Sequence, residues 1–190
     1  MGASKSTNKR HEKEKQIIER KAVLEDHSKS VKNRNAINLI YNKKIEDKEN
    51  EHCNKIFGKK FVENNKDNIT LIINGKKSLL IEEYELKNGS NYIQIIINKQ
   101  LTNLEDMFAN SVSLENIEEL KYLNTEEIKN FSYMFSNCSS LSDIKPLENW
   151  NVSNGNNFEG MFSWCSSLSD IKPLENWNVS DKNYFSQLLE

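Results

Sequence analysis

Two of the three cysteines occupy the same place in a repeated sequence. Cys138 and Cys165 lie 27 residues apart, and each is followed by SSLSDIKPLENWNVS. A structural zinc site needs four thiolate or imidazole ligands at short spacings such as C-x-x-C, and the three histidines lie far away in the first third of the chain. We therefore predict two buried, apolar thiols and no metal site, with a disulfide between adjacent copies as the alternative in an oxidising compartment.

Motifs that carry out catalysis are absent from the sequence, which has no glycine-rich phosphate loop, no H-E-x-x-H and no G-x-S-x-G. Carboxylates are plentiful, but 28 acidic residues balanced by 26 basic ones are typical of solvated surfaces. The net charge of −2 argues against general attraction to nucleic acid. We predict a protein that is not an enzyme, has no catalytic residues and no cofactor, and does not bind nucleic acid.

The amino terminus carries a candidate modification site. Its first six residues, MGASKS, match the M-G-x-x-x-[ST] pattern for myristoylation of Gly2. Basic residues between Lys5 and Lys15 would supply the second signal that one acyl chain needs for lasting membrane contact. This pattern predicts peripheral membrane contact through the amino terminus. The alternative is a chance Met-Gly start on a solvated tail, since Glu12, Glu14 and Glu19 dilute the basic cluster.

An internal repeat organises the second half of the chain. The segment Met134–Ser153 returns as Met161–Ser180 with a single change, from Asn137 to Trp164. A degenerate third copy begins at Met107 and keeps the apolar positions. Self-similarity at a period of 27 residues is typical of architectures in which supersecondary units contact their neighbours.

Each copy combines two spacings of apolar residues. Spacings of three and four put Phe131, Met134, Phe135 and Cys138 on one face of a predicted short helix. Spacings of three follow, and with Pro146 they favour a brief strand at Leu141–Lys145 and a return loop. One such unit cannot bury enough apolar surface to fold alone. We therefore predict an α/β solenoid, a short stack of about three 27-residue repeats.

The segment before the repeats is rich in β-forming residues. Asn74-Gly75 between Ile69–Ile73 and Ser78–Ile81 predicts a two-residue hairpin. A second hairpin is expected between Glu83–Leu86 and Tyr92–Ile97. The sequence thus predicts three parts: a charged helical or disordered tail (1–35), a β-rich region that caps the repeats (36–103), and the repeats themselves (104–190).

Asparagine recurs at one position of all three copies, at Asn124, Asn151 and Asn178. In stacked repeats an asparagine there can bond to backbone groups that the turning chain leaves unpaired. We expect a buried ladder of these side chains.

The compartment follows from hydropathy and cysteine number. No run of about 18 apolar residues is present, and the amino terminus lacks the apolar core of a secretion signal. Three cysteines, an odd number, fit a reducing compartment better than a disulfide framework. We predict a monomeric, cytoplasmic protein, which peripheral contact through the amino terminus would bring to a membrane.

The phrases YMFSNCSSL, GMFSWCSSL and ENWNVS resemble the repeats of BspA-like leucine-rich repeat surface proteins, and the preceding IFGKKFVENNKDNITLIINGKKSLLIEEYEL is similar to the part that precedes such repeats. The resemblance covers roughly residues 54–185. It implies that the predicted solenoid is a short leucine-rich repeat stack with a binding or adhesion role and no catalytic residues, and it gives the cell surface as an alternative location. Gly155 departs from the pattern, because the equivalent residue in the previous copy is Ile128, and a weakened core layer is expected there.

We expect the function to be protein–protein interaction through polar residues on the strand side of the repeats, with an unknown protein partner. The alternatives are a membrane-peripheral scaffold anchored at Gly2 and an extracellular adhesin whose signal is missing. Trp164, which breaks the near-identity of the last two copies, would either anchor a partner or pack on the end of the repeats. The predicted contact residues are Glu115, Glu118, Asp143, Lys145, Asp170, Lys172 and Trp164.

Overall fold

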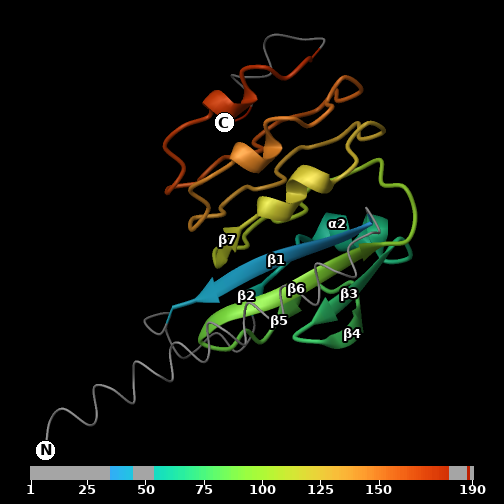
Figure 1. Ribbon diagram of the computed structural model, residues 1–190, viewed down its shortest axis with the longest axis vertical. Helices are drawn as coiled ribbons and strands as arrows, with labels where there is room; N and C mark the ends of the chain where they lie inside the picture. Colours follow the sequence, from blue (N-terminus) through green and yellow to red (C-terminus); the bar gives the residue numbers. More distant parts are fainter. Residues whose placement is uncertain (1–34, 45–53, 180–187, 189–190) are drawn as a thin grey trace, which may run out of the picture. The chain divides into compact units, whose positions relative to one another are not determined.

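The computed structural model describes residues 35–44, 54–179 and 188 (Figure 1). The chain divides into two units, Met1–Arg34 and Asn35–Glu190, and all the described residues belong to the second. The predicted tail and its lipidation site Gly2 lie outside the described residues.

An antiparallel sheet of five strands forms one part of this unit, in the order β4-β3-β6-β1-β7. Strand β1 pairs along its whole length with β6, from Ala36 opposite Ile96 to Lys43 opposite Gly89. The alternation of residues along the central strands places Leu39, Leu71 and Ile95 on one buried face. The strands are β1 (Ala36–Lys43), β3 (Ile69–Ile73), β4 (Lys76–Leu79), β6 (Gly89–Ile97) and β7 (Leu114–Asn116).

The hairpin predicted at Asn74-Gly75 is confirmed. It joins β3 to β4, and both turn residues have positive φ, 48° at Asn74 and 81° at Gly75. Asparagine and glycine adopt this left-handed conformation at low cost, and the resulting turn matches the twist of the two strands. Local sequence therefore sufficed to place this connection.

The second predicted hairpin is wrong. Strand β5 (Glu83–Tyr84) pairs with β2 (Asn54–Lys55) in a separate two-stranded sheet, and not with β6. The side chain of Asn91 closes the loop before β6, since it accepts a hydrogen bond from the Lys87 N–H at 3.0 Å and donates to the Lys87 carbonyl at 2.8 Å. This closed loop directs the chain away from a simple hairpin.

One α-helix is present in the described part of the chain, α2 (Lys59–Asn65), and the sequence did not reveal it. No helix among these residues has the length and apolar character required to cross a bilayer. The aromatic ring of Phe57, just before the helix, lies 5.8 Å from Phe61 within it and 5.7 Å from Phe108 of the first copy. The helix is therefore packed on the repeats through buried aromatic residues.

The predicted α/β leucine-rich repeat solenoid is wrong. In the described residues the structure has two antiparallel sheets, one α-helix and short 3₁₀ helices, without alternating helix–strand repeats. The predicted helix at Phe131–Cys138 consists of turns, because Tyr133 and Asn137 have positive φ values of 54° and 58°, which an α-helix cannot contain. The predicted strand at Leu141–Lys145 is absent as well.

Short 3₁₀ helices occur instead at equivalent places of the copies, at η1 (Glu118–Tyr122), η2 (Lys145–Leu147) and η3 (Lys172–Leu174). The one strand within the described copies, β7, pairs with β1 of the large sheet and not with another copy. Regular helix–strand units therefore do not form.

Adjacent copies contact one another in register through these turns. The N–H of Leu104 donates to the carbonyl of Asn130 at 2.9 Å, and the N–H of Phe131 donates to that of Asn157 at 2.8 Å. The ring centroids of Phe131 and Phe158 lie 5.1 Å apart, and those of Phe135 and Phe162 lie 5.4 Å apart. Equivalent residues of neighbouring copies are thus direct neighbours in space.

The weakened core layer expected at Gly155 is not found. Gly155 is buried, and a Cβ placed on it would lie 2.5 Å from the ring of Phe158. The phenylalanine ring therefore occupies the space that a larger side chain would need.

Gly58 provides a test of the contact between α2 and the first copy. A Cβ there would lie 2.1 Å from the carbonyl oxygen of Asp106, whereas the φ of −75° is ordinary for any residue. We expect Gly58→Ala to lower the free energy of unfolding by roughly 2–3 kcal/mol, because the clash is with backbone that cannot rotate away. Urea denaturation measures the change.

Gly89→Ala is the matched control, since Gly89 has φ of +86° and nothing within 4 Å of the added Cβ. It should cost only about 1 kcal/mol, from the left-handed backbone alone. Equal losses for both variants would contradict the close approach at Gly58.

Candidate functional site

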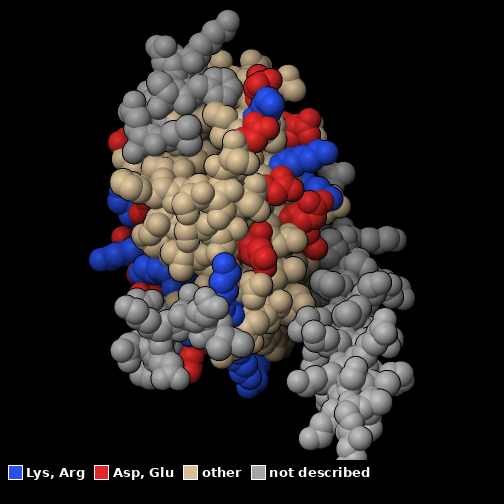
Figure 2. Space-filling view, turned by 90° about the vertical axis from the view of Figure 1, so that its left-hand side faces the viewer, with Lys and Arg blue, Asp and Glu red and all other residues tan. Residues whose placement is uncertain are grey.

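Six of the predicted contact residues form what we call the charged row: Glu115, Glu118, Asp143, Lys145, Asp170 and Lys172. All six are exposed. Glu118, Lys145 and Lys172 occupy one equivalent position, at the first residue of η1, η2 and η3. Since η1 contacts η2 and η2 contacts η3, these positions lie side by side. Figure 2 shows one face of the molecule, on which acidic and basic side chains are interspersed in a column.

Two aspartates of the charged row have a structural role. The Oδ1 atoms of Asp143 and Asp170 accept hydrogen bonds from the backbone N–H groups of Lys145 and Lys172, both at 2.8 Å. Asn116 makes the same contact in the first copy, with the N–H of Glu118 at 2.8 Å. Asp and Asn favour such turns because their short side chains reach the backbone two residues on. These side chains therefore fix three tight turns, which we call the corners, and Glu118, Lys145 and Lys172 project from them.

The other four side chains of the charged row differ in whether they already have a hydrogen-bond or ion-pair partner. Glu115 accepts a hydrogen bond from the side chain of Asn42 at 3.0 Å. Glu118 forms an ion pair with Lys121, and this hydrogen bond raises the pKa of Lys121. Lys172 Nζ lies 3.7 Å from Asp170 Oδ2. The Lys145 ammonium has no such partner in the part of the chain that the structure describes, so it is the most available of the charges.

Trp164 is exposed, as the partner-anchor alternative requires, and does not pack on the end of the repeats. Its exposed fraction is 80%, and its φ is 61°. The equivalent residues Asn110 and Asn137 have φ values of 64° and 58°. Asparagine tolerates this left-handed conformation, whereas an aromatic residue there is strained. The one substitution between the last two copies therefore places a poorly suited residue at this position and leaves its ring in solvent.

The segment that contains Trp164 and the equivalent segments of the other two copies hold no charged residue. We define the neutral band as the equivalent segments 109–113, 136–140 and 163–167, which contain no Asp, Glu, Lys or Arg. The amide of Asn137 donates to Oδ1 of Asn110 at 3.0 Å and links two of these segments. A broad area free of charged side chains borders the column of charges in Figure 2.

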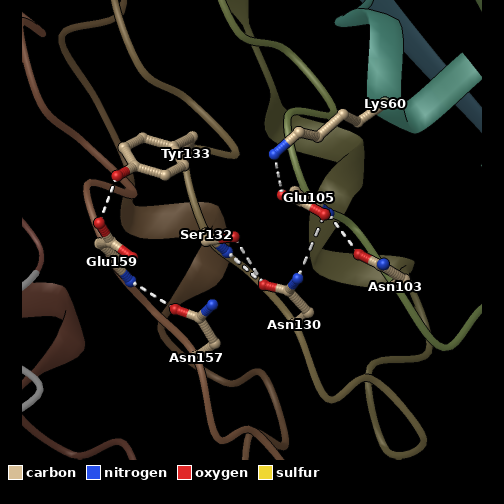
Figure 3. A network of polar contacts seen from close by, with 8 residues as sticks. All are labelled: Lys60, Asn103, Glu105, Asn130, Ser132, Tyr133, Asn157 and Glu159. Atoms are coloured by element: carbon tan, nitrogen blue, oxygen red, sulfur yellow. Dashed lines mark hydrogen bonds and ion pairs between the residues drawn. The ribbon is translucent and has the colours of Figure 1, made fainter.

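A second polar network, which sequence reasoning missed, joins α2 to the three copies (Figure 3). Asn103, Asn130 and Asn157 lie in register, connected by isolated parallel bridges. Each accepts a hydrogen bond from the backbone N–H two residues on, at 2.8, 2.9 and 3.1 Å respectively. The signal that could have found them is asparagine at a spacing of 27 residues, but asparagine is so common in this chain that the pattern did not stand out.

Charged groups close this network at its edges. Lys60 of α2 pairs with Glu105 at 2.5 Å, and this hydrogen bond raises the pKa of Lys60. Tyr133 donates to Glu159, which raises the pKa of the Tyr133 hydroxyl. Burial raises the pKa of Asp106 nearby. The bonds of Lys60 to Glu105 and of Tyr133 to Glu159 join neighbouring parts of the chain, so the network can hold the copies in register.

The prediction of a buried asparagine ladder at Asn124, Asn151 and Asn178 is wrong, because all three residues are exposed. Asn124 and Asn151 do bond to backbone, but locally, with Oδ1 accepting from the N–H groups of Glu126 at 3.1 Å and Ser153 at 3.2 Å. The recurring asparagine thus marks an exposed turn in each of these copies.

Cys138 and Cys165 lie buried inside the repeats, as predicted. Cys138 and Cys165 are buried free thiols that donate to the carbonyls of Phe108 and Phe135, at 3.1 and 3.0 Å. Burial raises the pKa of both thiols, that of Cys165 to about 11. They therefore remain protonated near neutral pH and are poor nucleophiles. Within the described ranges no three His, Cys, Asp or Glu side chains are grouped so that they could hold a metal ion.

Comparison with known proteins gives one match. The model of a family described as "Mycoplasma protein of unknown function, DUF285" matches residues 84–190, more than half of the chain. The match includes β6, the three copies, the charged row and the neutral band. No curated protein and no solved structure matches this chain.

The strain at Trp164 predicts a stabilising substitution. Trp164→Asn restores the residue of the other two copies in the same left-handed conformation, so we expect the free energy of unfolding to rise by about 1 kcal/mol. Chemical denaturation of the full chain measures it. Trp164→Ala is the control and should gain little, because alanine is also strained there. A loss of stability in Trp164→Asn would show that the indole contributes to packing.

The structural role of Asp143 is testable in the same way. Asp143→Ala removes the acceptor for the Lys145 N–H and should lower the free energy of unfolding by about 1 kcal/mol. Asp143→Asn retains the acceptor, as Asn116 does naturally, and should remain within a few tenths of the wild-type value. Equal effects of the two changes would mean that the charge of Asp143, and not this hydrogen bond, matters for stability.

Proposed function

The chain belongs to the DUF285 family, and we propose that it acts as a non-enzymatic protein-binding module whose contact surface is the charged row. The family description names no activity, so the proposal rests on the geometry of the row. The observation that carries it is the display of exposed charges at one equivalent position of three adjacent copies, on corners fixed by side-chain hydrogen bonds.

Fixed corners favour binding because little backbone freedom remains to be lost when a partner docks. The turns at Asn116, Asp143 and Asp170 set the direction of the residue two positions on. Only the side chains of Glu118, Lys145 and Lys172 then need to be ordered on binding. A surface of this kind discriminates between partners more by charge pattern than by buried apolar area.

The order of charges specifies what a partner would present. Along the three copies the equivalent position reads Glu118, Lys145 and Lys172, one acidic residue followed by two basic ones. Glu118 is paired with Lys121, and Lys172 is paired more loosely with Asp170 at 3.7 Å, so Lys145 carries the strongest unmet charge and Lys172 the next. We therefore expect a protein partner that presents carboxylates opposite Lys145 and Lys172, and binding that weakens as salt screens these contacts.

Charge reversal tests the proposal. The full chain is immobilised and exposed to lysate of the source organism, and recovery of bound protein is compared with that of the Lys145→Glu/Lys172→Glu variant. The expected result is a loss of recovery equivalent to about tenfold or more weaker binding, because two attractive contacts become repulsive. The aspartates that cap the corners are left in place, so the fold of the row is preserved.

The matched control is Lys76→Glu/Lys77→Glu, which makes the same change of net charge at two exposed lysines of β4. It should retain wild-type recovery. Equal recovery by the wild type and both variants would exclude the charged row as the contact surface.

A further inference from the structure

The requirements of the fold do not explain why position 164 holds a tryptophan. The position is left-handed in all three copies, and the other two hold asparagine, which suits it. The indole is 80% exposed and therefore buries little apolar area in return for the strain. The other two tryptophans differ, since Trp150 and Trp177 are buried and donate to the carbonyls of Leu120 and Leu147. An exposed, strained aromatic side chain of this kind is suited to contact with a ligand.

The surroundings of Trp164 restrict the chemistry of that ligand. The neutral band contains no charged residue, although 28% of the chain is charged. Within these three described segments a charged ligand would find no residue of opposite charge. A strongly apolar ligand would find little apolar surface to contact, because the exposed large apolar side chains of the band are Trp164 and Val112. What remains are amide and hydroxyl groups, which match a ligand that is polar and uncharged.

The spacing of the copies adds a second restriction. Backbone hydrogen bonds join the three segments of the band, from Asn110 N to the Ser136 carbonyl at 2.8 Å and from Asn137 N to the Ser163 carbonyl at 2.7 Å. The stacked rings beneath them repeat at 5.1–5.4 Å. Asn110, Asn137 and Trp164 share one backbone conformation and therefore leave the chain in similar directions. The step from one to the next is comparable to the length of one sugar ring.

We propose that the neutral band binds an uncharged glycan chain laid across the three copies. The indole of Trp164 stacks on the apolar C–H face of one sugar ring, a contact that needs an exposed, flat aromatic surface. The amides of Asn137 and Asn110 bond to the hydroxyls of the following rings. Their mutual hydrogen bond uses one donor and one acceptor, so each amide keeps groups that can donate to, or accept from, a sugar hydroxyl.

This site is separate from the charged row. The two surfaces share no residue, and the glycan site requires no charge, whereas the protein contact depends on Lys145 and Lys172. A protein or peptide ligand of the neutral band is the competing outcome, and it is less favoured because the band offers one large aromatic residue without the cluster of apolar anchors that protein interfaces use.

Tryptophan fluorescence provides the measurement, since Trp150 and Trp177 are buried and Trp164 is exposed. The full chain is titrated with neutral β-linked glucose, mannose and N-acetylglucosamine oligomers, from single sugars to hexamers. The expected result is a saturable change in emission for at least one series. Affinity should rise up to about three units and then level off, because three copies line the band.

Variants identify the residue that binds. Trp164→Asn should abolish the emission change and, by calorimetry, weaken binding by about tenfold or more, although the variant folds at least as well as the wild type. Trp164→Phe keeps an aromatic face and should retain most of the affinity. Lys145→Glu/Lys172→Glu should bind the glycan as the wild type does, which separates this site from the protein contact.

The proposal is overturned if no neutral oligomer gives a saturable response, or if Trp164→Asn binds as tightly as the wild type. It is also overturned if only charged oligosaccharides or peptides bind at the band. Failure of glycan binding would leave the result of the charge-reversal experiment unaffected, because that experiment reports on different residues.

Discussion

Backbone hydrogen bonds between equivalent positions of adjacent copies are the constraint on which the repeat part of the structure depends. Donors at Leu104, Asp106, Phe108 and Asn110 reach carbonyls 26 residues further on, at 2.7–3.0 Å. This register brings equivalent side chains into contact, so that Phe135 lies on Phe162 and Trp150 lies on Trp177. A change that shifted one copy by a residue would break both the backbone bonds and the ring contacts at once.

The register is maintained only because certain residues adopt unusual backbone conformations. Two positions of each copy are left-handed, and they hold Asp106, Tyr133 and Gly160 at the first and Asn110, Asn137 and Trp164 at the second. Gly160 has a further reason to be glycine, since a Cβ there would lie 2.4 Å from the ring of Tyr133. The copies thus use Asp, Asn and Gly where the backbone requires them, and Tyr133 and Trp164 are the exceptions. Tyr133 has a hydrogen-bond partner in Glu159, whereas Trp164 is turned toward solvent.

Folding and binding place different demands on the surface residues. The sequence suggests Asp143 and Asp170 as contact residues, but the carboxylate of each already accepts a hydrogen bond from a backbone N–H. Among the described residues, the side chains of Lys145 and Trp164 make no comparable bond to the backbone, and the two proposed surfaces depend on them. A short repeat can therefore present two chemically distinct faces, one charged and one neutral, because the turns that shape each copy also hold its side chains apart.

The sequence by itself determined the period of 27 residues, the Asn74-Gly75 hairpin and the burial of Cys138 and Cys165, because each depends on local spacing or turn chemistry. Tertiary structure decided the rest. Spacings of three and four fit a helix as well as a series of turns, and the sign of φ at Tyr133 and Asn137, set by bonds to the next copy, excluded the helix. The partner of β5 and the exposure of Trp164 likewise depend on which distant segments come together, and local sequence does not encode that.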